Sequence, residues 1–489
     1  MKASIKVLCF VCVFCFMAGI LFCPSPVMGA KPNQKSTTAK TEAVAKWAAN
    51  PTAGFDASKI SDMSDFEPAT WEGPTGDVIK IAYVNAFSGP AAFNGQVHVL
   101  PILWAVHDIN KRGGIWVDGK RKLVTVIKAD HMSKPDQCKK VTERMVLQEK
   151  VHILIGTSGG NMMKIINEVG NKYNVIVMNE GSPVDSLMDA GNFGKYSFMP
   201  YYGVEQVGRS FAYYYGQIRK KENKFYVLCQ DYSFGHEIAE GFKKGLKEFF
   251  PGAQIVGEDY HKLFLTDFAP YLTKIKASGA DVIFSGDWPP DSSSLLKQAR
   301  QMGINIPIAD IYADEPNALH EIGIESSKGL VGISPYEIFP SFQNPGQIKL
   351  HKAWNDQAKK WKAPYNTFIY HHNASNLGSW MMYTYWLLDV IERAQSTDPE
   401  KILKVWEGDS YRMANGKVVK MRACDHKGIQ DLLVTELVPP DQQKASFNIP
   451  PYYWFKGCSF YGPGYVIPAE KVIPRMDDKL DRCAGQTGL

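Results

Sequence analysis

Beyond its first thirty residues, the sequence lacks any apolar run that approaches the roughly 20 residues that a membrane-spanning helix needs. An excess of charge of one sign is also lacking, because 55 Lys and Arg residues face 50 Asp and Glu residues and leave a formal net charge of +5. This balance provides no basic surface for nucleic acid, so we expect no nucleic-acid partner. A length of 489 residues, with 45% hydrophobic and 21% charged residues, predicts a soluble globular protein of about two or three domains.

Sequence motifs for cofactors and metals are also missing. The chain contains no GxGxxG and no Walker loop, which argues against a bound nucleotide. It contains no CxxC pair, which argues against a zinc site. His371 and His372 are neighbours and would point in different directions on a helix. We therefore expect no cofactor and no metal.

The N-terminus has the pattern of a secretory signal peptide. Lys2 and Lys6 precede the apolar run VLCFVCVFCFMAGILFC, and small residues suited to cleavage follow near Gly29 and Ala30. We therefore expect residues 1–30 to be removed and the mature protein to be periplasmic, with a formal charge of +3 after the loss of the two lysines. An uncleaved membrane anchor and a lipid attached at Cys23 are the alternatives.

Five of the nine cysteines lie beyond this leader, at Cys138, Cys229, Cys424, Cys458 and Cys483. An odd number leaves at least one thiol free or paired between chains. We expect a disulfide between Cys458 and Cys483, which are close in sequence, and a buried thiol at Cys229 in the apolar run FYVLC.

The order of strand and helix patterns predicts an α/β fold. Residues 31–76 are polar and broken by Pro, Gly and Ser, and form a lead-in. From Val78 onward, short apolar runs alternate with amphipathic segments, which predicts a mostly parallel sheet covered by helices. A second such series starts near Tyr201, so we expect two similar lobes. The Pro- and aromatic-rich last fifty or so residues predict irregular chain.

The segment Gly156-Thr157-Ser158-Gly159-Gly160 spells G-x-S-x-G between the strand pattern VHILIG and a helix expected to begin near Asn161. One interpretation is the nucleophile elbow of a serine hydrolase. The other is a turn whose backbone N–H groups and helix N-terminus hold a carboxylate. The hydrolase would need an HGGG-type loop upstream and a recognisable base downstream, and the sequence shows neither. The pattern therefore favours binding.

A similar turn, residues 179–183 (NEGSP), follows the next strand pattern, NVIVMN. The carboxyl ends of parallel strands meet at one edge of a sheet, so both turns can contact the same ligand. The alternative is that both are ordinary strand-to-helix turns.

An ordered set of segments resembles one protein family. It runs from SGPAAFNG through DINKRGG, KADHMSKPD, ILIGTSGG, DYSFGHEIAEGF, LLKQARQMGI and KGLVGISPY to GKVVKMRACDHKG. From residue 77 to about 440, this order is similar to the branched-chain amino-acid family of periplasmic ligand-binding proteins, the type I receptors of ABC transporters. The resemblance implies two Rossmann-like lobes joined by three crossovers. Lobe 1 would comprise residues 77–200 and 331–400, lobe 2 residues 201–330 and 401–440, and residues 441–489 would form a C-terminal extension.

The resemblance also implies a set of ligand contacts. The first-lobe turns would take the ligand carboxylate, aromatic side chains would cover its apolar part, and Glu315 would neutralise its ammonium. The family serine falls at Gly160 rather than Ser158, which puts the hydroxyl contact in doubt but not the amides. The alternative for Glu315 is a helix cap, and for the aromatics the core. The predicted site residues are Phe93, Asn94, Ser158, Gly159, Gly160, Asn161, Gly181, Ser182, Phe234, Trp288 and Glu315.

Together these features predict a monomeric receptor outside the cytoplasm and not an enzyme. It would capture an amino acid or a related small polar ligand between its lobes and deliver it to an ABC transporter permease. A secreted serine hydrolase using Ser158 and a ligand-sensing ectodomain without transport are the alternatives.

Overall fold

The computed structural model describes residues 46–313, 316–334, 345–366, 375–439, 460–474 and 482–483. The predicted signal peptide therefore lies outside the described residues, as do Glu315, Cys458 and the His371–His372 pair. In the part of the chain that is described, no helix is both long enough and apolar enough to cross a membrane.

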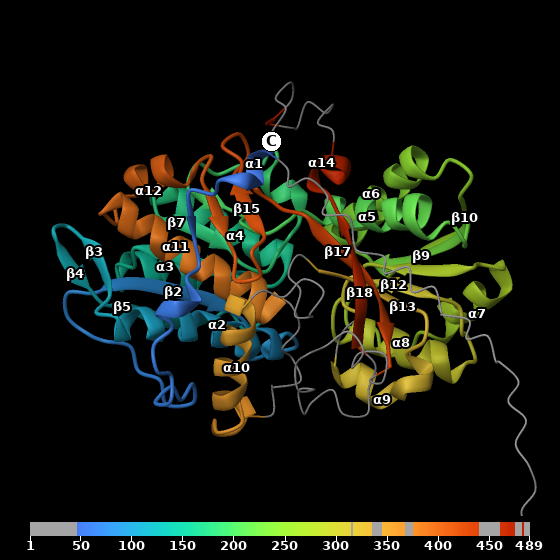
Figure 1. Cartoon of the computed structure of the whole chain (residues 1–489), viewed down its shortest axis with the longest axis horizontal. Coiled ribbons are helices and arrows are strands. Elements are labelled where there is room, and N and C mark those ends of the chain that lie inside the picture. The colour runs from blue at the N-terminus through green and yellow to red at the C-terminus, as the bar shows by residue number, and fades with distance from the viewer. Residues whose placement is uncertain are drawn as a thin grey trace, which may run out of the picture. The chain divides into compact units, whose positions relative to one another are not determined.

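The first lobe is built on a five-stranded parallel sheet of order β5-β2-β6-β7-β8. Its strands are β2 (Ile79–Asn85), β5 (Val124–Asp130), β6 (Ile153–Gly156), β7 (Ile176–Asn179) and β8 (Ser197–Phe198). Helices α2 (Ala92–Lys111), α3 (Pro135–Leu147) and α4 (Gly160–Lys172) connect them (Figure 1). Every residue of β6 and β7 is buried, as expected for parallel strands covered on both faces.

The second lobe is built on a seven-stranded sheet of order β10-β9-β11-β12-β13-β17-β18. Its strands are β9 (Lys224–Gln230), β10 (Gln254–His261), β11 (Val282–Ser285), β12 (Ile308–Asp310), β13 (Leu330–Ser334), β17 (Leu432–Val438) and β18 (Phe460–Ile467). Its helices are α5 (Val204–Tyr213), α6 (Ser233–Phe249), α7 (Ala269–Ser278), α8 (Asp291–Gln301) and α9 (Pro316–Ser326). In both sheets the first strand lies second from the edge, so the expectation of two similar α/β lobes is confirmed.

The chain passes between the two lobes three times. It enters the second lobe after β8, leaves it after β13, and returns before β17. On the first-lobe side, α11 (Met381–Ala394) packs against α2, and α12 (Pro399–Trp406) packs against α11. A small sheet of β1 (Ala53–Gly54), β14 (Ser410–Arg412), β15 (Val418–Met421) and β16 (Gly428–Ile429) precedes the last crossover. Two crossovers touch, because the Gly428 N–H donates to the Met199 carbonyl at 2.7 Å.

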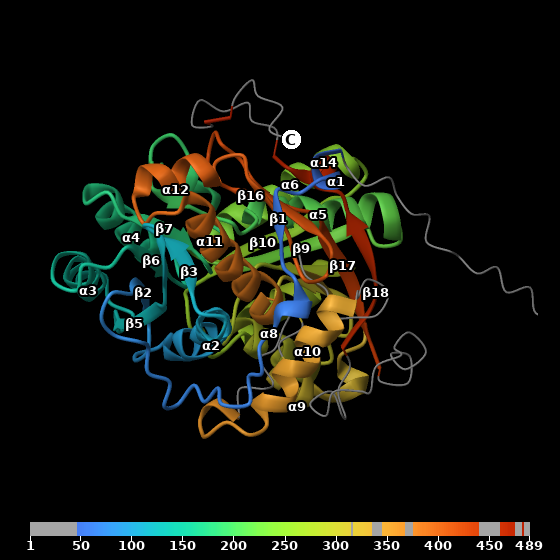
Figure 2. The same ribbon diagram turned by 60° about the vertical axis from the view of Figure 1, so that its left-hand side comes forward.

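The C-terminal region departs from the sequence-based expectation of irregular chain. Strand β18 runs antiparallel to β17 at the edge of the second sheet, and the short helix α14 (Ala469–Val472) follows it (Figure 2). The strand contains Gly462, Pro463 and Gly464, which disguise it in the sequence. An edge strand tolerates Pro and Gly because one side of its backbone needs no partner.

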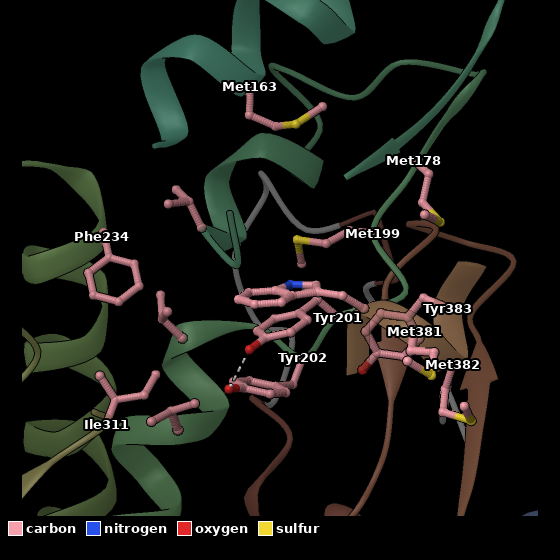
Figure 3. Close-up of a cluster of buried hydrophobic side chains, with 14 of the residues drawn as sticks. Met163, Met178, Met199, Tyr201, Tyr202, Phe234, Ile311, Met381, Met382 and Tyr383 are labelled. Atoms are coloured by element: carbon pink, nitrogen blue, oxygen red, sulfur yellow. Dashed lines mark hydrogen bonds between the residues drawn. The ribbon is translucent and has the colours of Figure 1, made fainter. Parts of the chain in front are cut away.

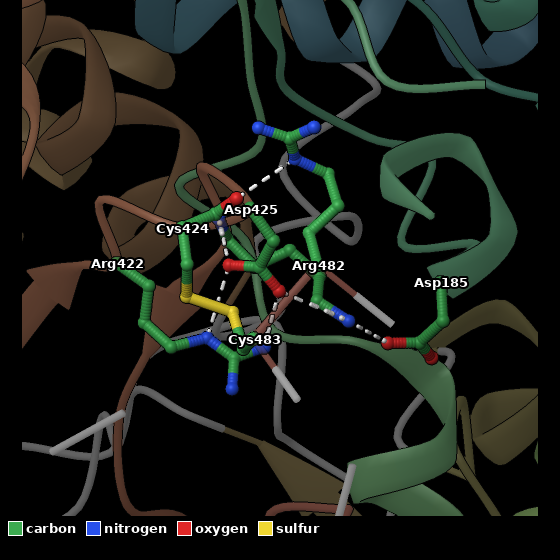
Figure 4. Close-up of a disulfide and its surroundings, with 7 residues drawn as sticks. Asp185, Arg422, Cys424, Asp425, Arg482 and Cys483 are labelled. Carbon is green, nitrogen blue, oxygen red and sulfur yellow. Dashed lines mark hydrogen bonds and ion pairs between the residues drawn. A yellow bond between two sulfur atoms is a disulfide. The ribbon is translucent and has the colours of Figure 1, made fainter. Parts of the chain in front are cut away.

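The disulfide joins Cys424 to Cys483, so the expected pair of Cys458 and Cys483 is wrong. The two Cα atoms lie 5.3 Å apart although 59 residues separate them in sequence. The chain returns Arg482 to the β15–β16 hairpin, where its Nε donates to the Cys424 carbonyl at 2.8 Å (Figure 4). Proximity in sequence was therefore a poor guide. Cys229 is free and buried, as expected.

Candidate functional site

The G-x-S-x-G segment forms a tight turn between β6 and α4. Helix α4 begins at Gly160, one residue before the expected start, and Gly159 has a φ of +95°, a left-handed conformation that favours glycine. The Met163 N–H donates to the Gly159 carbonyl and the Met162 N–H to the Asn161 side chain. Within the described residues, the N–H groups of Gly160 and Asn161 have no acceptor. They form the positive end of a helix dipole, where Asn161 is exposed and Gly160 is buried, and such an end attracts an anion.

The threonine of the same segment has a structural role. The Thr157 hydroxyl is buried and donates to Asn85 Oδ1 at 3.0 Å, and it lies 2.9 Å from His131 Nε2. Burial lowers the pKa of His131 to about 4, so its imidazole is neutral at physiological pH. These bonds tie the ends of β2, β5 and β6 together and leave Thr157 no freedom to contact a ligand.

The serine of the segment lies in a cluster that the sequence reasoning missed. Ser158 Oγ lies 3.4 Å from Nδ1 of His98, on α2. The His98 ring packs at 3.6 Å against Trp380, the last residue of η5 (Ser375–Trp380). The same Nδ1 lies 3.6 Å from Oε1 of Glu180, the residue between β7 and Gly181. The sequence signal for Glu180 is an acidic residue inside a turn of small residues. The prediction from sequence named the neighbouring Gly181 and Ser182 and not Glu180.

This geometry does not build a catalytic triad. In a triad the serine and the acid contact opposite nitrogens of the histidine, which lets the ring take a proton from one side while it is held from the other. Here Ser158 and Glu180 both approach Nδ1 of His98. The described contacts of Ser158 therefore lack the Ser-His-acid arrangement of a serine hydrolase.

We accordingly expect a serine-directed fluorophosphonate to leave Ser158 unmodified in the folded protein. Intact-mass analysis after incubation checks this, with a Ser158→Ala variant as the control and an active serine esterase as the positive reference. Stoichiometric labelling that disappears in Ser158→Ala would contradict the binding interpretation.

Two predicted residues, Phe93 and Asn94, lie in the first turn of α2. Phe93 is 36% exposed, and Asn94 is partly buried. They precede His98 on the same helix by about one turn. The structure thus places them beside the first-lobe cluster along α2.

The second lobe contributes an aromatic group at the carboxyl ends of its strands. Phe234, in the first turn of α6, is buried and stacks on Tyr232 at 5.9 Å. The hydroxyl of Tyr232 accepts a 2.7 Å hydrogen bond from Trp288 Nε1. The structure therefore links the predicted residues Phe234 and Trp288 through a tyrosine. Figure 3 shows the Phe234 ring directed toward the paired Tyr201 and Tyr202, whose hydroxyls are 3.0 Å apart.

A buried polar network holds the loop that carries Trp288. His261 Nε2 lies 2.8 Å from Asp287 Oδ2, and both side chains are fully buried. Asp291 accepts from Gln230 Nε2 at 2.8 Å and from the Phe264 N–H at 2.9 Å. Burial raises the pKa of Asp287 and that of Asp291. Asp287 is thereby fixed to the end of β10, and Asp291 to β9 and to the chain after β10.

The turns of the two lobes come together at the N-terminus of α4. A Cβ atom at Gly160 would lie 3.0 Å from Val184 of the first lobe and 3.4 Å from Ser233 Oγ of the second. Close by, Glu237 of α6 accepts from the N–H groups of Asp185 at 2.6 Å and Ser186 at 3.4 Å, in η2 (Asp185–Met188). The turn of residues 231–235 (DYSFG) in lobe 2 thus approaches the Ser158–Asn161 turn of lobe 1, whereas the position of Glu315 is not described.

The contact between Glu237 and η2 makes stability depend on pH. Burial, and then the nearby Asp185 carboxylate, raise the pKa of Glu237 to about 7. Between the ordinary pKa of 4.5 and about 7, the folded state holds a proton that the unfolded chain has released. The contribution of Glu237 to the free energy of unfolding is therefore complete below pH 4.5 and is lost as the pH rises through about 7.

Between about pH 5 and about pH 8, we expect the free energy of unfolding of the wild type to fall by about 2 kcal/mol more than that of the Glu237→Gln variant. Urea unfolding at the two pH values measures this difference. Glu240→Gln, at an exposed position of the same helix, is the control. Identical pH profiles for wild type and Glu237→Gln would contradict the assignment.

Metal-ligand spacing occurs once among the described residues, in Cys424, Asp425 and Cys483. The two sulfur atoms are bonded to each other, so this group is a disulfide beside a carboxylate and not a metal site.

The two Rossmann-like sheets, their shared strand order and the three crossovers define the class of type I solute-binding proteins. The family model for periplasmic binding proteins matches residues 78–444, well over half of the chain. The chain therefore belongs to the periplasmic binding protein family. One relative, Leu/Ile/Val-binding protein homolog 4 of Brucella abortus, is 25% identical over 263 residues, which are 51% of this chain and 60% of that protein. The match thus spans less than two thirds of the length of that relative.

Solved structures have the same fold at low sequence identity. A branched-chain amino acid transporter substrate binding protein from Streptococcus pneumoniae, in complex with isoleucine, matches with a TM-score of 0.63 and 18% identity over 80% of this chain and 99% of that chain. A solute binding protein of an ABC transporter from Rhodopseudomonas palustris, in complex with 3,4-dihydroxybenzoic acid, matches with a TM-score of 0.65 and 15% identity over 81% and 98%. At these identities the likeness concerns the fold alone.

Proposed function

We propose that this protein is a receptor outside the cytoplasm that captures an amino acid or a related small polar ligand between its lobes and delivers it to an ABC transporter permease. The observation that carries the proposal is the N-terminus of α4. Its Gly160 and Asn161 N–H groups are unpaired within the described residues, and Ser233 of the other lobe lies against it. A carboxylate held there would contact groups from both lobes.

What related proteins bind supports the proposed ligand class. The Brucella relative is named for leucine, isoleucine and valine, and the Streptococcus structure holds isoleucine, whereas the Rhodopseudomonas structure holds an aromatic acid. All of these compounds carry a carboxylate, which we assign to Ser158–Asn161 together with Gly181 and Ser182. Phe234 and Trp288 would cover the apolar part of the ligand, with Phe93 and Asn94 at the edge.

The work of such a receptor is differential binding between an open and a closed arrangement of its lobes. Contacts such as that between Glu237 and the Asp185 N–H join the lobes and would contribute to the closed state. We propose that the protein acts as a monomer in the periplasm after removal of residues 1–30. A sensing role without transport would use the same binding site.

The proposal is tested by thermal unfolding in the presence of a panel of the twenty amino acids, small amides and aromatic carboxylates. We expect one chemical class to raise the unfolding temperature by several degrees, because a ligand that binds only the folded state stabilises it. No shift with any member at millimolar concentration would contradict the proposal.

A further inference from the structure

Three buried polar atoms, two in the turn after β7 and one on Trp380, have no hydrogen-bond partner within the described residues. They are Glu180 Oε2, Ser182 Oγ and Trp380 Nε1. Glu180 and Trp380 both approach the ring of His98, and Ser182 follows Glu180 by two residues. Buried polar groups in folded proteins are almost always hydrogen-bonded, so this cluster needs partners from outside the described chain.

Of the three groups, the carboxylate of Glu180 has the greatest need for a hydrogen-bond donor. Its side chain is 0% exposed, and its described contacts are all on Oε1, which accepts from the Tyr83 hydroxyl at 3.0 Å and lies 3.6 Å from His98 Nδ1. A buried carboxylate is costly unless cations or hydrogen-bond donors satisfy it. The free oxygen therefore calls for a donor, and a second carboxylate beside it would be repelled.

The cluster lies at the same strand ends as the proposed carboxylate site. A Cβ atom at Gly181 would lie 3.5 Å from His98 Nδ1 and 3.8 Å from Trp380 Nε1. Ser158, Gly181 and His98 are partly exposed, so solvent contacts the cluster from their side. Ser158 Oγ and Glu180 Oε1 both lie within 3.6 Å of one His98 nitrogen, which is close enough for the two charged groups of a single small molecule.

We infer that Glu180 is a specificity-determining residue, whose Oε2 accepts a hydrogen bond from the amino group of the ligand while the N-terminus of α4 holds the ligand carboxylate. This assignment rests on the proposed function and narrows it. It favours compounds that carry an amino group close to a carboxylate, and it disfavours acids without such a donor. Trp380 Nε1 and Ser182 Oγ would donate to the oxygen atoms of the same ligand.

The experiment measures calorimetric affinities of the purified full chain for matched pairs of compounds. The pairs are L-leucine with 4-methylpentanoate, L-phenylalanine with 3-phenylpropanoate, and L-glutamate with glutarate. For the pair that binds, we expect the wild type to prefer the amino acid by about tenfold or more, since a hydrogen bond to a charged group has about that worth. Glu180→Gln should lower the affinity for the amino acid by about tenfold and the affinity for its deaminated partner by less than about threefold.

Two further variants serve as comparisons. Glu168→Gln changes an exposed acid on α4 and should leave both affinities unchanged. Glu315→Gln tests the acid that the resemblance implies for the second lobe. If Glu180→Gln does not fold, Glu180→Asp keeps the charge but withdraws it by one methylene, and the same selective loss is expected.

Equal losses for both members of a pair, an unchanged preference, or a selective loss in Glu315→Gln alone would overturn the assignment of Glu180. Failure of the wild type to bind any of the six compounds, or any member of the wider thermal panel, would instead contradict the proposed function.

Discussion

Replacing Lys427 with Met is expected to lower the free energy of unfolding by about 3 to 5 kcal/mol, the usual cost of removing one partner from a buried ion pair. The Lys427 side chain is only 12% exposed, and its Nζ lies 3.0 Å from Asp185 and 3.5 Å from Asp425. Burial opposes its charge, but the two carboxylates more than compensate and raise the pKa of Lys427. Loss of the ammonium would leave the Asp185 carboxylate without its cation, next to the carboxyl group of Glu237.

Lys172→Met provides the matched control. Lys172 is 60% exposed and lies 3.5 Å from Glu143, and exposed pairs of this kind contribute about 0 to 1 kcal/mol. Urea unfolding of both variants at neutral pH makes the comparison. A Lys427→Met variant as stable as Lys172→Met would show that the charge cluster of Asp185, Asp425 and Lys427 contributes little to the free energy of unfolding. Adding Asp185→Asn to Lys427→Met should recover part of the loss, because the uncompensated charge is then removed.

Removal of the disulfide is expected to have a similar effect. The Cys424→Ser, Cys483→Ser double variant opens a loop of 59 residues, for which the chain-entropy model gives a loss of about 4 kcal/mol. The bond ties Cys483 to the hairpin that carries Arg422 and Asp425, next to the charge cluster (Figure 4).

The wild type in the presence of dithiothreitol should unfold at the same urea concentration as the double variant, and dithiothreitol should not change the double variant further. Cys138 and Cys229 are buried and free, so they are not expected to contribute to this difference. Equal stability of the oxidised wild type and the double variant would contradict a stabilising role for the bond.

Much of the fold could be predicted from sequence because buried parallel strands are continuous apolar runs. VHILIG and NVIVMN correspond to β6 and β7, and the periodic segment after Gly160 corresponds to α4. The same reasoning failed for β18, where Gly462 and Pro463 interrupt the pattern of an edge strand. It also failed for the disulfide, because only the folded chain brings Cys483 to Cys424.

The candidate site was predicted only in part, for a related reason. Turns that follow strands have recognisable glycines and hydroxyl residues, so Ser158, Gly159 and Gly181 could be named from the sequence. His98 lies on α2 and Trp380 on η5, and only tertiary packing brings their rings within 3.6 Å of each other. Glu180 lies inside the turn of residues 179–183, but its complete burial and its free oxygen are properties of the fold.

The central claim, that the two lobes hold a small ligand, is tested most directly by native mass spectrometry of freshly purified protein, followed by denaturation and identification of any released compound. The account predicts one small molecule per chain that carries a carboxylate and an amino group. It also predicts that the emptied protein rebinds this molecule and that Glu180→Gln rebinds it more weakly. An unliganded protein that binds no member of the amino-acid and carboxylate panel would contradict it.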